Sequence, residues 1–451
     1  MKHIIVFITT IMMLTGCGVY NKYSRPEMQT ENLMGDIATD TTTLASVSWK
    51  ELFTDPHLQS LIETGLQNNT EMKITHLRVE QAEALLSSAR MAYLPSLSLT
   101  PEGSISSFDR QKAVKTYNLA ASASWEIDIF GKITNAKRQA QASLSETLAY
   151  RQAVQTNLVA TIANTYYTLL MFDHQREISR ETLRNWQETI RTLTTLKRSG
   201  QVNDIAIKQA EANKLTVEAS LLSIEKQINE IKNSLSSLLG STPFEIERDS
   251  LLNQDFPSEL SVGIPLQLLG NRPDVAQAEY ALQQAFYATN QARAAFYPSI
   301  TLGGSAGWTN NAGEIIINPG KMLLSAVGSV VQPIFNKGVN RANLRIAKAR
   351  QEEALLLFQQ KLLDAGSEVN NALFQWQTAR SRRQLNLQQI ELLQSAERQT
   401  RLLMQHSEIN YLEVLTTEKT LLDAQLAETV DIFDEIQGVI NLYHALGGGK
   451  F

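Results

Sequence analysis

Several short stretches of the chain alternate apolar and small polar residues. In the first stretch, Leu97 and Leu99 alternate with Ser96 and Ser98. Because successive side chains of a β-strand point to opposite faces, this alternation gives a strand one apolar and one polar face. The same pattern recurs over 117–127 and 299–308, and less regularly over 322–332.

The alternating stretches predict two hairpins, at about 96–128 and 299–333. Strands of about ten residues are long enough to cross a bilayer when tilted. Trp125, Trp308 and Tyr117 are placed near predicted strand ends, where membrane barrels carry aromatic girdles. A hairpin of a soluble β-sandwich shows the same alternation, so the pattern alone leaves both interpretations open.

Most of the remaining chain favours helix. The segment 57–93 is predicted helical and ends before Pro95, which lacks an N–H and disfavours helix in the residue before it. No Pro or Gly interrupts 132–196, and 339–403 contains only Gly366. At 1.5 Å per residue, each of these runs makes a helix about 100 Å long.

The helix that follows 132–196 carries the apolar seam of a coiled coil. Its apolar residues recur in steps of four and three, which predicts about three heptads of helix–helix packing. The seam consists of Val217, Leu221, Ile224, Ile228, Ile231, Leu235 and Leu238.

The two halves of the chain are copies of one unit. The segments around Pro95 and Pro298 align without a gap at an offset of 203 residues. Further along, Leu196 aligns with Leu403 and Glu211 with Glu418, both at an offset of 207. An internal duplication of about two hundred residues therefore sets the architecture.

Four strands in one chain leave a closure problem. Membrane barrels have about eight strands or more, and an open sheet edge leaves unpaired backbone groups that lipid cannot satisfy. If the strands cross a membrane, other chains must complete the barrel.

The N-terminus has the features of a lipoprotein signal. Lys2 and His3 precede an apolar run over 4–14, which is too short to span a bilayer as a permanent helix. The run ends in Leu14-Thr15-Gly16-Cys17, which resembles the lipobox of bacterial lipoproteins, whose cysteine becomes the acylated N-terminus. Cys17 is therefore the expected lipid anchor. The next residue is Gly18 rather than Asp, and in this the chain resembles lipoproteins that are sent to the outer membrane. An ordinary secretory signal that happens to hold a cysteine is the alternative.

Composition narrows the function. A net charge of -5 without a basic cluster argues against a nucleic-acid partner. One cysteine and six scattered histidines give no metal site. No phosphate loop, zinc-ligand motif or Gly-x-Ser-x-Gly elbow is present, so we expect neither an enzyme nor a cofactor.

Short motifs are spread almost from end to end of the chain. They include Tyr23-Ser24-Arg25-Pro26, Trp49-Lys50-Glu51-Leu52-Phe53, Asn271-Arg272-Pro273-Asp274, Phe296-Tyr297-Pro298-Ser299, Gln332-Pro333-Ile334-Phe335 and Asn410-Tyr411-Leu412-Glu413. In this order and spacing they resemble the TolC-like outer-membrane factors, in the lipoprotein branch that serves RND-type pumps. Ser407 departs from the family, which usually has Gly at the second tip, and Lys450 stands where Trp usually follows the closing glycines.

The resemblance implies a mainly helical chain with membrane β structure. Three copies would join their four strands each into one 12-stranded transmembrane barrel, and their long helices would form a periplasmic tunnel. It further implies an outer-membrane channel of a tripartite efflux pump, which conducts passively. Its partners would be two further copies of itself, a periplasmic adaptor (membrane fusion protein), an inner-membrane pump of RND type, and outer-membrane lipids.

The resemblance also assigns site residues. Two helix-turn-helix tips would point into the periplasm and dock the adaptor. Their residues are Gly200, Gln201, Val202 and Asn203 in the first tip, and Ser407, Glu408, Ile409 and Asn410 in the second. Near the second tip, Glu397, Arg401 and Glu408 are candidate members of a latch that closes the resting channel. Solvated helix charges are the alternative explanation for these three residues.

Two alternatives to the efflux channel stay open. One is a type I secretion exit duct of the same fold, and the other is a lipid-anchored periplasmic adaptor or coiled-coil protein.

The domain organisation follows from the signal, the duplication and the join between the repeats. The expected segments are a signal peptide over 1–16, a lipid-anchored extended segment over 17–56, the first repeat over 57–240, a linker over 241–265, the second repeat over 266–447 and a tail over 448–451.

Overall fold

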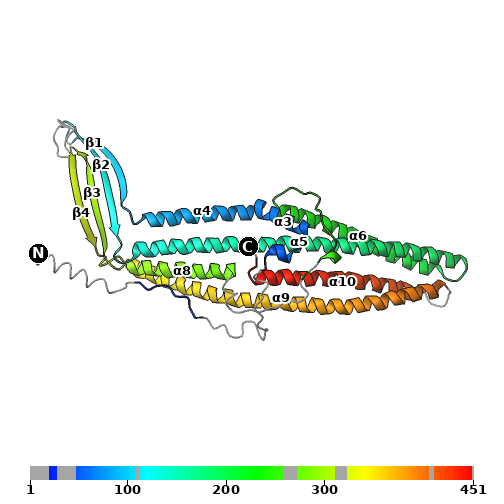
Figure 1. Cartoon of the computed structure of the whole chain (residues 1–451). Helices are drawn as coiled ribbons and strands as arrows, with labels where there is room; N and C mark the ends of the chain where they lie inside the picture. The colour runs from blue at the N-terminus through cyan, green and yellow to red at the C-terminus, as the bar shows by residue number, and fades with distance from the viewer. Residues whose placement is uncertain are drawn as a thin grey trace. The chain divides into compact units, whose positions relative to one another are not determined.

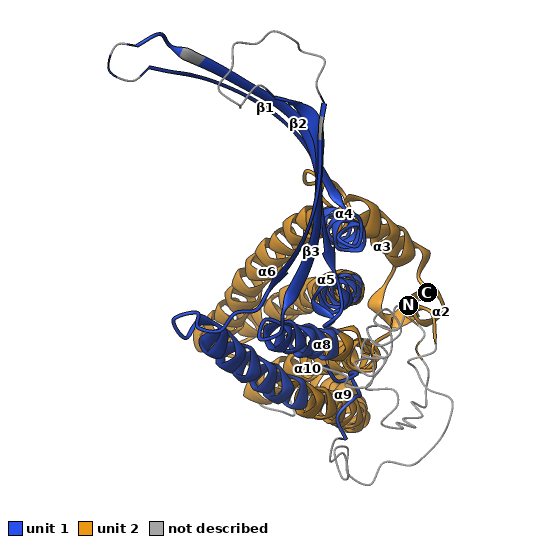
Figure 2. Ribbon diagram, turned by 90° about the vertical axis from the view of Figure 1, so that its left-hand side faces the viewer, with its two compact units in different colours: residues 1–28, 77–148, 277–360 blue, residues 29–76, 149–276, 361–451 orange. Residues whose placement is uncertain are grey.

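The computed structural model describes residues 20–27, 47–107, 109, 111–254, 256, 272–309, 322–405 and 411–448. The chain forms two compact units. Unit 1 comprises residues 1–28, 77–148 and 277–360, and unit 2 comprises residues 29–76, 149–276 and 361–451 (Figure 2). Each unit therefore draws segments from both copies of the duplicated sequence.

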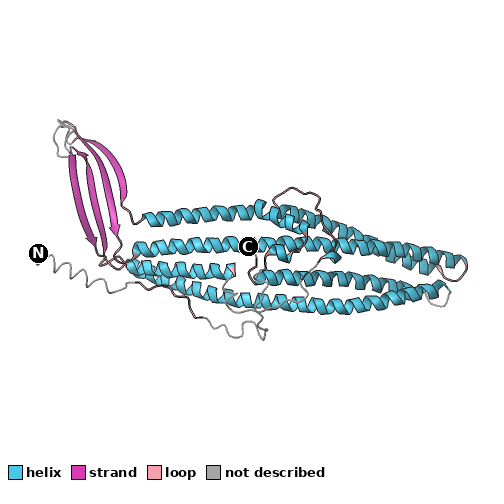
Figure 3. Ribbon diagram, viewed as in Figure 1, coloured by secondary structure: helices cyan, strands magenta, loops and turns pink. Residues whose placement is uncertain are grey.

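Helices account for most of the described residues (Figure 3). A short helix, α2 (Trp49–Leu52), begins with a capping box between Ser48 and Glu51. The other elements are named in Figure 1. The helices are α3 (Pro56–Asn68), α4 (Thr70–Met91), α5 (Lys132–Arg198), α6 (Asp204–Leu238), the short 3₁₀ helix η3 (Leu251–Asn253), α8 (Pro273–Ala294), α9 (Val339–Gln405) and α10 (Tyr411–Ala445).

The helix expected over 57–93 is two helices, because Asn69 ends α3 and starts α4. The Asn69 side-chain oxygen accepts hydrogen bonds from the backbone N–H groups of Glu71 (2.9 Å) and Met72 (3.2 Å), which caps α4. Its side-chain NH₂ donates to the carbonyl of Leu238 at 2.9 Å. The break thus also ties this corner to the end of α6.

The four strands form one antiparallel sheet in unit 1, in the order β1-β2-β3-β4 (Figure 1). Both predicted hairpins are present, and they pair with each other through β2 and β3. The strands are β1 (Ser96–Ser106), β2 (Val114–Ile127), β3 (Ser299–Thr309) and β4 (Met322–Val331).

The duplication is visible in the element lengths. Helices α5 and α9 both have 67 residues, and α6 and α10 both have 35. Their first residues lie 207 positions apart, as in Lys132 and Val339. Helices α4 and α8 both have 22 residues and start 203 positions apart. Strands β1 and β3 also start 203 positions apart, so the offset changes between the start of the first strand and the start of the long helix.

Within unit 1, residues 20–27 pack on α5, α8 and α9. The Tyr23 ring meets Phe286 edge to face, with ring centroids 5.6 Å apart. The carbonyl of Asn21 accepts a hydrogen bond from Asn290, and Arg25 forms an ion pair with Glu279 at 3.4 Å. The segment that follows Cys17 is thereby held against the helices.

Within unit 2, the predicted seam of α6 lies in the core. Val217, Ile224, Ile228 and Leu235 are buried. At the far end of the helices, one apolar cluster contains residues of α5, α6, α9 and α10, including Trp186, Leu193, Ala210, Met404 and Val414. The ends of both long hairpins therefore share one core.

Candidate functional site

The sheet has one apolar and one polar face, as the alternation predicts. Register aligns Leu97 with Ala123, Ala123 with Gly304 and Gly304 with Ala326 on the apolar face. On the other face Ser98 lies beside Ser122, and Ser305 beside Ser325. Hydroxyl–hydroxyl hydrogen bonds join these pairs at 2.8 Å and 2.6 Å. The polar face is thus a ladder of small hydroxyl side chains.

Aromatic residues stand at both ends of the apolar face. Trp125 lies near the end of β2 that leads into α5, and its indole N–H donates to the carbonyl of Tyr93 at 2.8 Å. Trp308 and Tyr117 lie near the opposite end. This arrangement confirms the predicted aromatic positions, with an apolar band between them.

The sheet has two open edges among the described residues. Strand β1 pairs only with β2, and β4 pairs only with β3. Leu97 and Leu324, on the apolar faces of these edge strands, are 81% and 68% exposed. Exposed edges of this length invite strands of another chain.

The first tip is a tight turn between α5 and α6. Gly200 has φ +77°, a left-handed conformation that favours glycine. The N–H of Gln201 donates to the carbonyl of Leu196 at 2.9 Å, and that of Gly200 to Lys197 at 3.0 Å, which makes a Schellman motif. Asn203 then caps α6 by accepting from the N–H of Ala206. The turn leaves the polar surface of Gly200, Gln201 and Asn203 exposed.

A partly buried ion-pair network lies near the end of α9. Arg401 forms ion pairs with Glu397 on its own helix and with Glu418 of α10, the latter at 2.9 Å. Glu188 of α5 lies 3.9 Å from the same guanidinium. Thr189 of α5 donates a hydrogen bond to Glu418 at 2.8 Å. The network therefore joins three helices through one arginine.

Glu418 is the unusual member of this network. It is 6% exposed, and burial raises its pKa to about 7, with a further upward contribution from Glu397. The hydrogen bond from Thr189 and the charge of Arg401 oppose this rise. Desolvation of the carboxylate is therefore only partly compensated by its partners.

The structure brings together some of the predicted site residues. Glu397 and Arg401 are in contact, whereas Glu408, the second tip and Cys17 lie outside the described residues. Sequence reasoning missed Glu418, Thr189 and Glu188 as network members. Glu418 did stand out as a marker of the duplication, but only the folded helices show that it is buried.

None of the described helices is long and apolar enough to cross a membrane. In the same part of the chain, no group of three or more His, Cys, Asp or Glu residues is placed to hold a metal ion.

Comparison with known proteins gives consistent matches. The model of a family described as outer membrane efflux protein matches residues 61–241 and 264–448. The cation efflux system protein CusC of Escherichia coli is 29% identical and aligns over 97% of each chain. The probable outer membrane lipoprotein SilC of Salmonella typhimurium is 27% identical over 98% of each. A crystal structure of CusC, solved to follow transmembrane channel formation, superposes with a TM-score of 0.87 at 27% identity, over 96% of this chain and 100% of that chain.

Proposed function

The chain belongs to the outer membrane efflux protein family and is the outer-membrane channel of a tripartite efflux pump; we propose which of its residues anchor, dock and close that channel. Three copies contribute four strands each to a shared transmembrane barrel, and their helices form the tunnel. The channel contributes no energy of its own. The inner-membrane pump, of RND type, drives transport through a periplasmic adaptor.

The observation that carries this function is the four-stranded sheet with two open edges. A sheet with an apolar face, flanking aromatic residues and unpaired edges is stable in lipid only if its edges are paired. Strand β1 of one copy paired with β4 of the next supplies the missing hydrogen bonds. The hydroxyl-lined face then lines the water-filled interior, and the apolar face contacts lipid.

The first tip supports the docking proposal. Gly200, Gln201, Val202 and Asn203 form a compact turn with two backbone hydrogen bonds, and Ile205 beside it is 59% exposed. A rigid turn with an exposed apolar residue suits the helical hairpin of an adaptor. We assign the second docking surface to Ser407, Glu408, Ile409 and Asn410 from the duplication.

The ion-pair network supports the latch proposal. Arg401 ties α9 to α10 and lies near α5, so separation of these helices would break its ion pairs. In the resting state the network holds the helix ends together, and the adaptor separates them. We therefore propose Glu397, Arg401 and Glu408 as latch members, as the sequence predicts, and add Glu418 to them.

The N-terminal segment supports a lipid anchor at Cys17. Two residues separate Cys17 from Tyr20, and residues 20–27 are held by contacts within unit 1, which also contains the sheet. At about 3.5 Å per residue, three residues span roughly 10 Å. Acylated Cys17 is therefore tethered within roughly 10 Å of Tyr20.

The native mass of the protein tests the channel assignment. Wild-type protein is extracted in detergent from outer membranes, beside a Cys17→Ala variant that carries a cleavable signal. We expect a trimer in the membrane fraction for both, because the shared barrel and not the lipid holds the chain in the bilayer. A soluble monomer in the absence of the acyl chain would contradict the barrel and favour an anchored adaptor.

A further inference from the structure

Four helices of unit 1 continue the four strands of the sheet. Helix α4 leads into β1, β2 into α5, α8 into β3, and β4 into α9. The helices lie in the same order as the strands (Figure 2). Hydrogen bonds join neighbours in this row: the Tyr93 hydroxyl, just after α4, lies 2.9 Å from that of Thr134 of α5, and Thr289 of α8 donates to the carbonyl of Ala347 of α9 at 3.1 Å. Helices α4 and α9 are therefore the outer members of the row.

The inner helices of this row are covered on both sides, whereas the outer helices are not. Every residue of α8 is buried or half-buried, and so are most residues of α5 over 132–148. On α9, Phe358 is the one fully buried residue over 339–360. Helix α4 is buried over 77–91 along a single stripe, which consists of Val79, Ala82 and Leu86.

Each outer helix exposes a further stripe. Its residues recur in steps of four and three, the spacing of helices that pack along a shared seam. Leu77 of α4 and Leu356 of α9 are 55% and 56% exposed, and Ile346 of α9 is 50% exposed. The α4 stripe consists of Leu77, Gln81, Ala84, Ser88 and Met91, and the α9 stripe of Ala342, Ile346, Ala349, Glu353 and Leu356. Exposed apolar side chains at this spacing indicate a helical partner on each outer helix.

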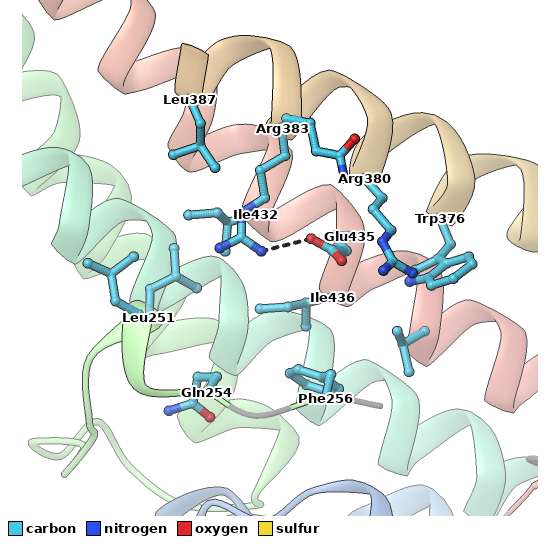
Figure 4. A pocket seen from close by; sticks show the side chains of 13 residues that line it. Leu251, Gln254, Phe256, Trp376, Arg380, Arg383, Leu387, Ile432, Glu435 and Ile436 are labelled. Carbon is cyan, nitrogen blue, oxygen red and sulfur yellow. Dashed lines mark hydrogen bonds and ion pairs between the residues drawn. The ribbon is translucent and has the colours of Figure 1, made fainter. Parts of the chain in front are cut away.

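A cavity of about 450 Å³ in unit 2 gives no such indication of a partner. Residues of α9, α10 and η3 line it (Figure 4). Arg383 donates a hydrogen bond to Glu435 at 3.0 Å, and the Arg380 guanidinium lies over the Trp376 ring. These arginines already have partners within the chain.

The contact between α5 and α8 shows how a seam of this kind is built, because α5 is the duplicate of α9 and α8 is the duplicate of α4. Side-chain hydrogen bonds join the two inner helices. They run from Asn290 to Asn135 (3.3 Å), from Gln291 to Gln139 (2.6 Å) and from Gln284 to Glu146.

The duplication carries the last of these hydrogen bonds onto the two exposed stripes. At an offset of 207 residues, Glu146 of α5 corresponds to Glu353 of α9. At an offset of 203 residues, Gln284 of α8 corresponds to Gln81 of α4. The acid and the amide are thus the same in both repeats, but Gln81 and Glu353 are exposed.

The other two hydrogen bonds map onto the same faces of the outer helices. At the same offsets, their four amide side chains correspond to Ala342 and Ile346 on α9 and to Ser87 and Ser88 on α4. Small or apolar residues therefore replace these amides in the outer helices, and the pair of Gln81 and Glu353 is retained.

We propose that the α9 stripe of one copy packs against the α4 stripe of the next copy, where the Gln81 amide donates a hydrogen bond to the Glu353 carboxylate. The inference rests on the trimer of the proposed function, in which β4 of one copy pairs with β1 of the next. Because α9 follows β4 and α4 precedes β1, that pairing places the two helices side by side, as the pairing of β2 with β3 does for α5 and α8. One turn farther from the sheet, Leu356 faces Leu77 of the neighbouring copy.

Cross-linking between copies tests the seam. Gln81→Cys and Glu353→Cys are combined in one chain, and the detergent-solubilised protein is treated with a short bis-methanethiosulfonate. This reagent is used because long side chains in contact can hold their Cα atoms too far apart for a direct disulfide. We expect covalent trimers on a denaturing gel, which a reducing agent converts to monomers. Each single variant should give monomers, and so should Gln81→Cys combined with Glu352→Cys, since Glu352 lies off the α9 stripe.

The native mass separates a failure of the seam from a failure of the trimer. A protein that is trimeric by native mass, but whose double cysteine variant is not cross-linked, would overturn the seam and leave the channel assignment intact. A protein that is monomeric by native mass would overturn both.

An exchange of the two side chains tests the hydrogen bond itself. Gln81→Glu places two carboxylates opposite each other and should lower the temperature at which the trimer dissociates at pH 8, because like charges repel. Adding Glu353→Gln restores one amide and one carboxylate in exchanged positions, and should return this temperature to that of the wild type. If the second change restores nothing, Gln81 and Glu353 are not paired.

Discussion

The two long hairpins, α5–α6 and α9–α10, have the same helix lengths but different chemistry at the same positions. Glu211 of α6 and Glu418 of α10 lie 207 residues apart, at equivalent positions of the duplication. Glu211 is partly exposed and pairs with Lys208 at 3.1 Å. Glu418 is buried and faces Arg401.

The partners of these two acids explain the difference. At the offset of 207, Ile190 and Thr194 of α5 correspond to Glu397 and Arg401 of α9. The first hairpin therefore has an apolar residue and a hydroxyl where the second has an ion pair. The helices have the same lengths in both copies, and at this level the second copy has charged residues where the first has Ile190 and Thr194. The ion pairs of the second hairpin are the contact that we propose to break when the channel opens.

The substitution with the largest expected effect on the second hairpin is Arg401→Ala. At pH 8 this change leaves the neighbouring carboxylates of Glu397 and Glu418 without their common counter-charge, which destabilises the contact between α9 and α10. We expect the closed tip to open, seen as a large rise in single-channel conductance or opening frequency in a planar bilayer.

The matched control is Arg398→Ala, because Arg398 is exposed on the same helix. It should conduct like the wild type. If Arg401→Ala also leaves conductance unchanged, Arg401 is a structural residue and the latch lies elsewhere.

A change of pH should act on the second hairpin through Glu418. Its pKa is about 7 in the packed state against an ordinary value of 4.5. The packed state therefore binds a proton that the opened state, with a solvated carboxyl, releases. Protonation stabilises the closed tip fully below pH 4.5, and the effect is lost as pH rises through 7, for a difference of about 3 kcal/mol at most.

Opening frequency should accordingly rise between pH 4.5 and 7 and level off above it. Glu418→Gln, which imitates the protonated acid, should keep the channel closed and remove this dependence. An unchanged pH profile in Glu418→Gln would assign the titration to another group.

The sequence predicted the strands and long helices because their determinants are local. Alternation over 96–101 and the absence of Pro and Gly over 132–196 each dictate an element by themselves. The break between α3 and α4 was missed although the cap that Asn69 gives to α4 is local; only its further hydrogen bond to the carbonyl of Leu238 needs the folded chain. The burial of Glu418 was missed because Thr189 and Arg401 come from two other helices.

A smaller effect should follow from Gly200→Ala in the first hairpin. No atom lies within 4 Å of the added Cβ, so the change strains only the backbone at φ +77°. We expect a loss of about 1–2 kcal/mol at this turn. Gly200→Asn should cost less, because Asn tolerates this conformation. Thermal unfolding of the trimer and adaptor binding measure both variants, and equal effects of Ala and Asn would argue against a role for the left-handed turn.

The smallest effect should come from Glu211→Gln, the counterpart of Glu418→Gln. Glu211 forms an ion pair with Lys208, whose side chain is 67% exposed, and exposed ion pairs contribute little to stability. Conductance and its pH profile should therefore match the wild type within error, although the same atoms are exchanged at the equivalent position. If Glu211→Gln shifted the pH profile as much as Glu418→Gln, both hairpins would share the latch. The difference between the copies would then lie outside Glu397 and Arg401, the two residues that distinguish α9 from α5 at this level.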